Sequence, residues 1–189
     1  MSGIVPTKDR FCSYCGTAYV EPLVYPRTCS NAACKVTVWA NPIPVSVVLV
    51  PVRAEPGVGL LVVRRGIPPG KGKLALTGGF LEEHERWQVG GAREVLEETG
   101  VQVDAAKLEP LWFTSTEPVP NRVLLFSVAP ILERTALSAF KPSTESEERG
   151  LIFGPTGLEE VFAFPLHLQA ARKWFDSQGL TGPHRFTPA

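Results

Sequence analysis

The sequence predicts an α/β fold, in which a mixed β-sheet lies between helices and follows a small cysteine-rich module. Two observations predict this fold. Short apolar runs typical of strands alternate with helical segments in the order β-β-β-α-β-β-β-α. All four cysteines precede the first long apolar run. We therefore expect the module over residues 1–40, the α/β domain over residues 41–180 and a loose tail over residues 181–189.

The cysteines occur as Cys12-x2-Cys15 and Cys29-x4-Cys34, a spacing typical of a zinc ribbon with tetrahedral coordination. The second pair has four intervening residues where two are more common. Disulfides and free thiols are the alternatives, and a reducing cytoplasm disfavours disulfides. Since four thiolates leave zinc no open position, we expect a structural Zn²⁺ and not a catalytic one.

Apolar runs place the strands of the α/β domain. Residues 45–52 form a nearly continuous apolar strand, consistent with burial on both faces. A turn at 55–57 and a strand at 60–64 complete a hairpin, and a third strand spans 74–77. Beyond the first helix we expect the following elements: strands at 108–114 and 122–129 joined by a loop at 117–121, a strand at 150–153, a short helix at 157–161 and a final helix at 166–178.

Residues 79–101 follow the pattern G-x5-E-x7-R-E-V-L-E-E-T-G-V. Gly100 is a suitable C-terminal stop for a helix, and His84 or Glu85 is a suitable start. At about 100° per residue, three carboxylates fall within about 100° of arc; they belong to Glu94, Glu97 and Glu98. Gly90 and Gly91 lie on that arc, one turn earlier. The opposite arc is apolar and is expected to face the core; it holds Val89, Ala92, Val95 and Leu96.

A solvated acidic face is the ordinary interpretation of such a cluster, but this helix fits it poorly. Like charges at i,i+3 and i,i+4 destabilise a helix by about 0.2–0.5 kcal/mol per pair, and anions are disfavoured in its C-terminal half. Each internal glycine costs about 1 kcal/mol relative to alanine. A helix surface that meets divalent cations and a phosphate chain accounts for these features, and oxygen ligands suit Mg²⁺ or Mn²⁺.

Arg93 is a natural partner for Glu97 at i+4, or for a carboxylate in the preceding loop. A guanidinium can hold a carboxylate bidentately and fix its direction. A simple surface ion pair is the alternative, and it would contribute a few tenths of a kcal/mol.

The composition excludes several classes of function. Lysine plus arginine and aspartate plus glutamate each number 19, so the net charge is zero. This balance argues against broad attraction to nucleic acid or to a membrane surface. No apolar stretch approaches the roughly 18 residues of a membrane span. Residues 1–10 lack the apolar run of a signal peptide, so we expect a cytoplasmic protein.

With every defined position filled, residues 79–101 resemble the Nudix box. The resemblance implies the Nudix α/β/α sandwich and hydrolysis of a pyrophosphate bond. It also implies that Glu94, Glu97 and Glu98 ligate Mg²⁺ or Mn²⁺, that Glu85 assists, and that one of these carboxylates activates water. His84-Glu85 stands where many members have Gly-Glu, so His84 is either exposed or in contact with a substrate phosphate.

In this family a loop glutamate downstream often completes the metal site or acts as the base. Glu148 is our first candidate for this role and Glu145 the second, with a solvated loop as the alternative. Arg64, Arg65 and the nearby lysines at 71 and 73 are candidates to bind phosphate, with solvated surface as the alternative. Gly79 and Phe113 are further candidates for contact with the ligand, although an aromatic ring more often packs in a core.

A cysteine ribbon joined to a Nudix domain resembles two groups of enzymes. One group comprises NADH pyrophosphatases, which also cleave NAD-type caps from RNA, and the other acts on FAD and ADP-ribose. The Ser-Gln-Pro-Trp-Pro-Phe-Pro stretch of the first group is absent, because residues 112–118 are Trp-Phe-Thr-Ser-Thr-Glu-Pro. The FAD/ADP-ribose type therefore fits better.

The resemblance thus implies a small-molecule dinucleotide substrate and release of a nucleoside monophosphate. The alternatives are a non-catalytic module that senses ADP-ribose or NAD, and an NAD-cap RNA hydrolase. Zero net charge disfavours nucleic acid as the partner. Nudix enzymes of this type are often homodimers, which is our expectation for this chain.

Overall fold

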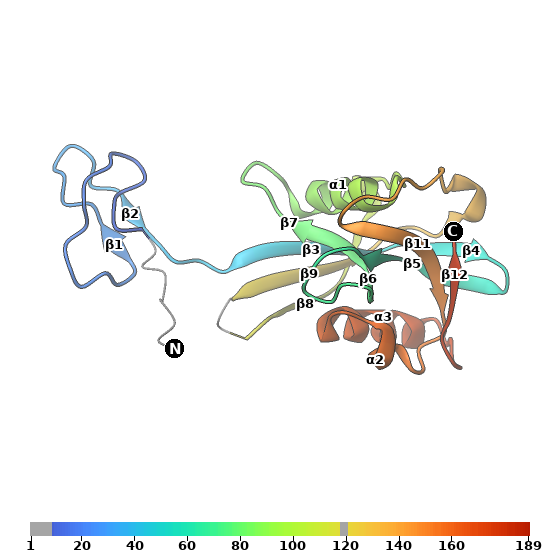
Figure 1. The fold of residues 1–189 in the computed structure, drawn as a ribbon. Coiled ribbons are helices and arrows are strands. Elements are labelled where there is room, and N and C mark those ends of the chain that lie inside the picture. The colour runs from blue at the N-terminus through green and yellow to red at the C-terminus, as the bar shows by residue number, and fades with distance from the viewer. Residues whose placement is uncertain (1–8, 118–120) are drawn as a thin grey trace. The chain divides into compact units, whose positions relative to one another are not determined.

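A computed structural model describes residues 9–117 and 121–189. The chain forms two compact units, Met1–Pro42 and Ile43–Ala189 (Figure 1). Most of the N-terminal segment considered above and the centre of the expected loop at 117–121 lie outside the described residues.

The first unit has little regular structure. Strand β1 (Arg27–Thr28) pairs antiparallel with β2 (Thr37–Val38), while Cys12 and Cys29 are buried. Arg27 donates to the carbonyls of Asp9 and Leu23 at 2.5 and 3.1 Å. A pair of strands this short is not stable by itself, so the unit depends on contacts around its cysteines.

The second unit contains two mixed sheets. The first has the order β7-β3-β9-β8, with β3 parallel to β9 and the other pairs antiparallel. Its strands are β3 (Ile43–Leu49), β7 (Thr77–Phe80), β8 (Glu109–Ser115) and β9 (Arg122–Val128).

The second sheet has the order β10-β4-β5-β11-β12, with β6 also pairing with β5. Strands β4 and β10 are parallel, and the remaining pairs are antiparallel. The strands are β4 (Pro51–Ala54), β5 (Gly57–Arg65), β6 (Leu74–Ala75), β10 (Leu132–Glu133), β11 (Ser146–Phe153) and β12 (Arg185–Pro188).

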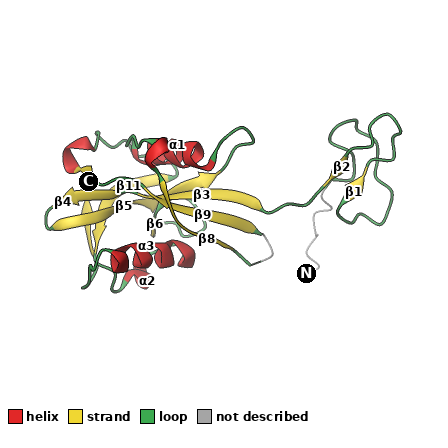
Figure 2. Ribbon diagram, turned by 180° about the vertical axis from the view of Figure 1, so that it is seen from behind, coloured by secondary structure: helices red, strands yellow, loops and turns green. Residues whose placement is uncertain are grey.

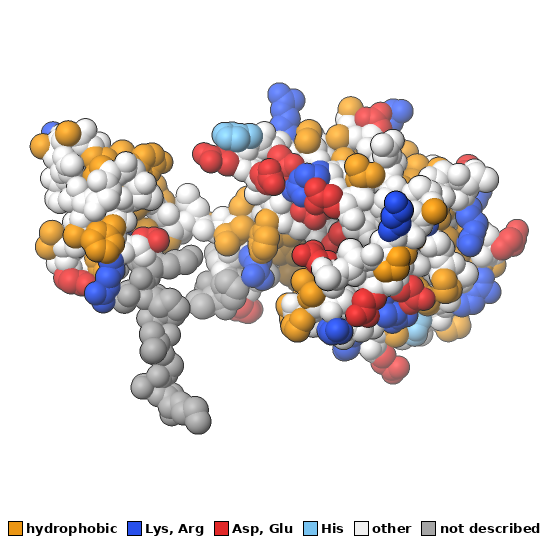
Figure 3. All heavy atoms as spheres, turned by 45° about the horizontal axis from the view of Figure 1, so that its top comes forward, with side chains coloured by type: hydrophobic (Ala, Val, Ile, Leu, Met, Phe, Trp, Pro, Cys, Tyr) orange, Lys and Arg blue, Asp and Glu red, His pale blue; other side chains and the backbone are white. Residues whose placement is uncertain are grey.

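Helices cover the sheets from two sides (Figures 1 and 2). Helix α1 (Trp87–Thr99) lies on one side, and α2 (Leu158–Val161) and α3 (Pro165–Ser177) lie on the other. Short 3-10 turns occur at Ala105–Lys107 and Arg134–Ala136. The expected α/β sandwich with mixed sheets is confirmed. Acidic side chains gather on the side that carries α1 (Figure 3). None of the helices in the described part of the chain has the length and apolar character to cross a membrane.

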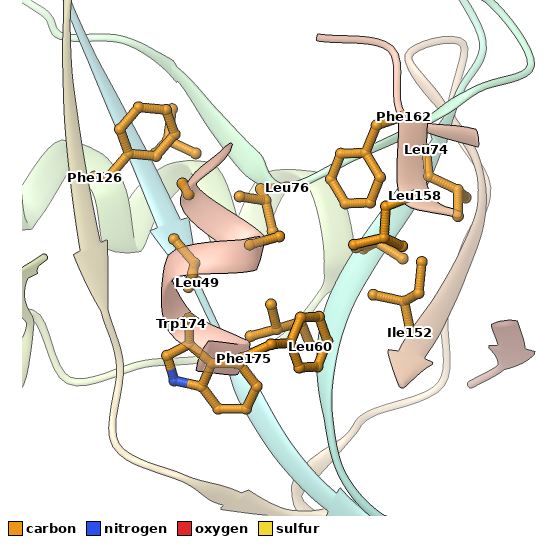
Figure 4. Packing of buried hydrophobic residues seen from close by; sticks show 14 of the residues in the cluster. Leu49, Leu60, Leu74, Leu76, Phe126, Ile152, Leu158, Phe162, Trp174 and Phe175 are labelled. Atoms are coloured by element: carbon orange, nitrogen blue, oxygen red, sulfur yellow. The ribbon is translucent and has the colours of Figure 1, made fainter. Parts of the chain in front are cut away.

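Two apolar clusters hold the layers together. The larger one packs α3 against the sheets, with Trp174 and Phe175 meeting Leu49, Leu60 and other strand residues (Figure 4). The smaller one includes Val48 and Val95 and lies beneath α1. Burying side chains of this kind contributes about 1.5–3 kcal/mol each, so the helices are fixed mainly by these faces.

The apolar run at 45–52 differs from our expectation of one strand. It supplies β3, which ends at Leu49, and β4, which begins at Pro51, and the two belong to different sheets. The run is nearly all apolar because both strands are largely buried over these residues. The hairpin of β4 and β5 forms as expected, with Ala54 opposite Gly57.

The expectation of a loose tail over 181–189 is wrong for residues 185–188. These residues form β12, which pairs antiparallel with β11. Gly150 makes room for this strand, since a Cβ there would lie 2.3 Å from the ring of Phe186. Arg149 adds a bond from its Nε to the carbonyl of Ala189 at 3.0 Å.

Helix α1 ends at Gly100, which has φ of 72° as expected for a C-terminal stop, but it begins at Trp87 and not at residue 84 or 85. Its buried face also differs from the prediction. Val95 is buried, whereas Val89 and Leu96 are 50% and 43% exposed. The buried positions are Gly90, Gly91, Val95 and Thr99. The helix is therefore rotated so that its glycines face the protein.

The physical reason is close packing. A Cβ at Gly91 would lie 2.7 Å from Ser46 Oγ and 2.8 Å from Val48 Cγ2, both on β3. A Cβ at Gly90 would lie 2.4 Å from Leu81 Cδ2. Within the fold, these glycines allow the helix to approach the sheet, and this explains why the helix tolerates them.

We predict that Gly91→Ala lowers the free energy of unfolding. Overpacking against β3 costs about 1–3 kcal/mol and outweighs the gain of up to about 1 kcal/mol that alanine brings to a helix. Thermal or urea unfolding measures the difference. Gly57→Ala is the matched control, because nothing lies within 4 Å of its added Cβ. A Gly91→Ala protein as stable as the parent would contradict this account of the packing.

Candidate active site

The guanidinium of Arg93 organises three carboxylates. Its Nε and Nη2 donate to the two oxygens of Glu85 at 2.7 and 2.9 Å. Its Nη1 donates to Glu94 Oε1 at 2.8 Å and to Glu97 Oε2 at 3.1 Å. Nη2 also donates to the carbonyl of Phe80 at 3.1 Å. Both partners that the sequence offered for Arg93 are therefore engaged, Glu97 on the helix and Glu85 in the preceding loop.

Two further carboxylate contacts connect α1 with the glycine pair of β7. Glu98 Oε2 accepts the backbone N–H of Gly78 at 3.1 Å. Glu94 lies against Gly79, where a Cβ would fall 2.4 Å from Glu94 Oε1. Gly78 has φ of 154°, and a Cβ there would lie 2.3 Å from the carbonyl oxygen of Ser46. Side chains at 78 and 79 would thus displace both the strand and the acids above it.

The acids differ in their electrostatic environment. Hydrogen bonds from Arg93 hold the pKa of Glu85 at about 2. Burial raises the pKa of Glu98 to about 8, with the charge of Glu94 adding to the effect. Burial also raises the pKa of Glu94, against the influence of Arg93. Glu94 and Glu98 are therefore poorly solvated carboxyl groups, and protein cations do not fully compensate their ionised form.

This donor set fits a hard divalent cation. Carboxylate oxygens are the ligands that Mg²⁺ and Mn²⁺ prefer, and a nearby cation favours the ionised form that burial disfavours. Glu85 differs from the others, because Arg93 occupies both of its oxygens and Oε2 also accepts the N–H of Glu82 at 3.1 Å. His84 is exposed.

The two loop glutamates lie in different surroundings. Glu148 lies opposite Arg64 on neighbouring strands, and its Oε2 accepts from Arg64 Nε at 2.7 Å. The charge of Glu145, in contrast, acts on both Glu94 and Glu98. The charge of Glu145 therefore reaches the cluster, whereas Glu148 is paired with Arg64. Arg64 is likewise engaged, since its Nη1 donates to the carbonyl of Gly72 at 3.0 Å.

A cavity of about 780 Å³ borders the glycine pair of β7, although no carboxylate of α1 is among the described residues that line it. Gly78 and Gly79 form part of its wall, so the strand that contacts Glu98 and Glu94 also borders this space. Arg65 lines it, with its guanidinium 4.8 Å from the ring centroid of Phe164. The cavity falls in the size range of ligand pockets, about 300–1,000 Å³.

The structure does not bring Phe113 to this cavity. Phe113 is 74% exposed on β8, and it is not among the described residues that line the space. Alternation along the strand turns its neighbour Trp112 inward, where it stacks on Phe126 with centroids 5.3 Å apart. The expected contact of Phe113 with a ligand therefore finds no support.

Arg122 and His167 are among the cavity residues that sequence reasoning missed. Arg122 comes from β9 and lies over the ring of Phe80, 5.4 Å from its centroid. His167 comes from α3 and is 7% exposed. Neither lies in a recognisable motif, and a long-range fold brings both to the cavity, so the sequence offered no signal for them.

The four cysteines of the first unit also converge. Their sulfurs all lie within 4.8 Å of one another, with 3.5 Å between Cys15 and Cys29 and 3.8 Å between Cys12 and Cys34. All four are free thiols. Tetrahedral Zn²⁺ with Zn–S distances of about 2.3 Å separates sulfurs by about 3.8 Å, so the cluster is consistent with a zinc ribbon.

An α/β sandwich with grouped carboxylates on one helix, beside a large cavity, defines a hydrolase acting on phosphorus anhydrides. The sequence profile of the NUDIX domain matches residues 42–176. The chain therefore belongs to the Nudix family of pyrophosphohydrolases, whose members use divalent cations. No curated protein sequence gives a significant match.

Solved structures share the fold. A NUDIX hydrolase from Nitrosomonas europaea is 24% identical, with a TM-score of 0.63 and coverage of 92% of this chain and 96% of that chain. The NUDIX domain of Shewanella oneidensis NrtR, complexed with ADP ribose, is 17% identical, with a TM-score of 0.61 and coverage of 74% and 90%.

A third structure is a bifunctional NMN adenylyltransferase/ADP ribose pyrophosphatase from Francisella tularensis, complexed with AMP and a manganese ion. It is 19% identical, with a TM-score of 0.55 and coverage of 74% of this chain and 42% of that chain. At these identities the likeness concerns the fold alone.

We predict that Arg93→Gln destabilises the protein most in buffer without divalent cations. Without the guanidinium, the carboxylates that it holds repel one another and lose hydrogen bonds, at a cost of about 1–3 kcal/mol. Added Mg²⁺ should restore more stability to this variant than to the parent, because it replaces the missing positive charge. Thermal unfolding with and without Mg²⁺ measures both effects.

Arg53→Gln is the control for Arg93→Gln, because the Arg53–Glu133 pair is exposed, with a 3.2 Å distance, and such pairs contribute about 0–1 kcal/mol. Equal responses of Arg93→Gln and the parent to Mg²⁺ would refute the organising role of Arg93.

Proposed function

We propose that this protein hydrolyses the pyrophosphate bond of a dinucleotide of the FAD or ADP-ribose type and releases a nucleoside monophosphate. One observation carries the proposal. The poorly solvated carboxylates of Glu94 and Glu98 contact the same glycine pair that borders the 780 Å³ cavity. A diphosphate over the acids therefore leaves its attached moiety at the cavity.

In this proposal Glu94, Glu97 and Glu98 hold divalent cations, Mg²⁺ or Mn²⁺. When bound, such cations neutralise phosphate oxygens and lower the pKa of bound water. Arg93 keeps three carboxylates in fixed directions, and Glu85 anchors Arg93 through its bidentate contact. A water oxygen attacks one phosphorus, the bridging P–O bond breaks, and a carboxylate takes up the proton of the water. The products are two monophosphates.

The substrate class rests on two kinds of support. The cysteine ribbon ahead of the Nudix domain is typical of the enzymes to which the sequence bears resemblance. Two of the structural neighbours are described with ADP ribose, one as a complex and one as an ADP ribose pyrophosphatase. The grouped acids favour catalysis over a sensing module, because ligand recognition alone does not require them.

We also propose that the cysteine cluster holds a structural Zn²⁺. Four thiolates satisfy tetrahedral zinc and leave no position for a substrate. A two-stranded unit with few buried side chains gains its stability from such a site.

The first test is a substrate panel of FAD, ADP-ribose, NADH and NAD-capped RNA with Mg²⁺ or Mn²⁺. We expect release of a monophosphate from FAD or ADP-ribose. Glu97→Gln and Glu98→Gln should each lower kcat by orders of magnitude, because they remove negative charge that the reaction requires. Unfolding curves of the variants establish that they remain folded. Full activity in both variants would overturn the site assignment.

The same panel distinguishes the two loop glutamates. Glu145→Gln should lower kcat more than Glu148→Gln, since Glu145 acts on the cluster and Glu148 pairs with Arg64. The reverse order would favour Glu148.

For zinc, elemental analysis of protein purified without chelator should find about one zinc per chain. Cys12→Ser should lower this content and the stability of the first unit, because a thiolate ligand is lost. Zinc-free protein with four reduced thiols and an unchanged melting curve would exclude a structural metal.

A further inference from the structure

The wide spacing of the second cysteine pair is a feature that the chemistry described above leaves unexplained. Two residues separate Cys12 from Cys15, whereas four residues separate Cys29 from Cys34. Ordering the additional residues costs conformational entropy, so a specific contact has to offset that cost. The side chain of Asn31, which lies inside the wider loop, makes such a contact.

The loop between the second pair of cysteines holds the Asn31 amide in one orientation. Its Oδ1 accepts the backbone N–H of Ala33 at 2.9 Å. Its backbone carbonyl accepts the N–H groups of Cys34 and Lys35 at 2.9 and 3.0 Å. Because Ala33 engages the amide oxygen, the amide nitrogen points the other way. The donor of this side chain is therefore aimed by the loop that carries it.

This donor reaches the first pair of cysteines. Asn31 Nδ2 lies 3.9 Å from Cys15 Sγ and 3.4 Å from Thr17 Oγ1. The Thr17 hydroxyl itself lies 3.3 Å from the same sulfur. Cys15 is the one exposed member of the four cysteines. Two polar side chains, one from each cysteine loop, therefore meet at the sulfur that the protein covers least.

Such contacts suit a thiolate that is bound to a metal ion. Four thiolates around one Zn²⁺ leave a net charge of about −2, which hydrogen-bond donors beside the sulfurs offset. An amide N–H₂ and a hydroxyl can both donate in this way. Partners of this kind orient the atoms that ligate a metal, and their loss typically weakens metal binding by about 10–100-fold.

We propose that Asn31 is a positioning residue of the metal site, and that it acts with Thr17. Both side chains donate to the Cys15 thiolate and keep this exposed ligand on the metal. The four-residue spacing of the second cysteine pair brings Asn31 to the first pair. The proposal rests on the structural Zn²⁺ proposed above and is independent of the proposed hydrolysis.

The test is a titration of the full-length, reduced, metal-free protein with Zn²⁺ in the presence of a competing chelator. Asn31→Asp keeps the oxygen that Ala33 requires and replaces the donating nitrogen with an anionic oxygen. It should weaken Zn²⁺ binding by about 10–100-fold. Asn31→Ser retains an acceptor for the Ala33 N–H and removes the donor without adding charge, so it should weaken binding by about tenfold.

Substitutions at Thr17 test the second donor. Thr17→Val removes the hydroxyl at nearly constant volume and should weaken Zn²⁺ binding by about tenfold. Thr17→Ser keeps the hydroxyl and should bind within a few-fold of the parent. Thr37→Val is the matched control, because its hydroxyl lies 2.8 Å from that of Thr28 in the same unit. Its Zn²⁺ affinity should be unchanged.

Co²⁺ supplies a spectroscopic measurement that a purely structural role would not alter. A hydrogen bond to a thiolate stabilises the sulfur lone pair, so its loss makes electron transfer from sulfur to Co²⁺ easier. The sulfur-to-Co²⁺ charge-transfer band of Asn31→Asp and Thr17→Val should therefore move to longer wavelength. The band of Thr37→Val should stay where it is in the parent.

Two results would overturn the proposal in distinguishable ways. A parent protein that binds neither Zn²⁺ nor Co²⁺ would refute the structural metal and this role of Asn31 with it. A parent that binds both ions, with Asn31→Asp and Asn31→Ser equal to it in affinity and in band position, would refute the role of Asn31 alone. Neither measurement involves a nucleotide, so the outcome of the substrate panel does not affect them.

Discussion

The close approach of α1 to the first sheet is the constraint on which the site depends. Gly91 allows the helix to contact β3, and Gly78 and Gly79 allow β7 to lie directly beneath Glu98 and Glu94. A methyl group at Gly91 would press on β3, one at Gly79 on Glu94, and one at Gly78 on the backbone of β3. The acids are consequently both well ordered and poorly hydrated. Poorly hydrated like charges usually repel one another and move apart. Here Arg93 keeps three carboxylates together by donating hydrogen bonds to all of them.

Much of this arrangement was predictable because it is local in sequence. The helix stop at Gly100, the partners of Arg93 and the grouping of the acids follow from helical periodicity and short-range pairing. The buried face of α1 was not predictable in the same way. Hydropathy predicts that Val89 and Leu96 are buried, whereas close packing buries the glycines instead. Contacts between residues that are distant in the sequence were the hardest to predict. Strand pairing alone decides that Glu148 meets Arg64, and nothing in residues 185–188 indicated that Gly150 makes room for β12.

The net charge of the protein is zero, but its charged side chains are unevenly distributed. Carboxylates pair with Arg93 and Arg64, whereas Arg65 and Arg122 line the cavity and lie over aromatic rings. The cavity therefore combines positive charge at some points with neutral, apolar surface at others, which net charge does not reveal.

The clustered acids and the cavity wall are built from different parts of the chain. The acids come from α1 and its loop, the wall comes largely from β9 and the start of α3, and the two meet at residues 78–80. A substitution in α3 can thus alter the shape of the wall while the carboxylates keep their positions. Under the proposed function, such a scaffold can change its preference for one substrate over another while the carboxylates that hold the cations stay in place.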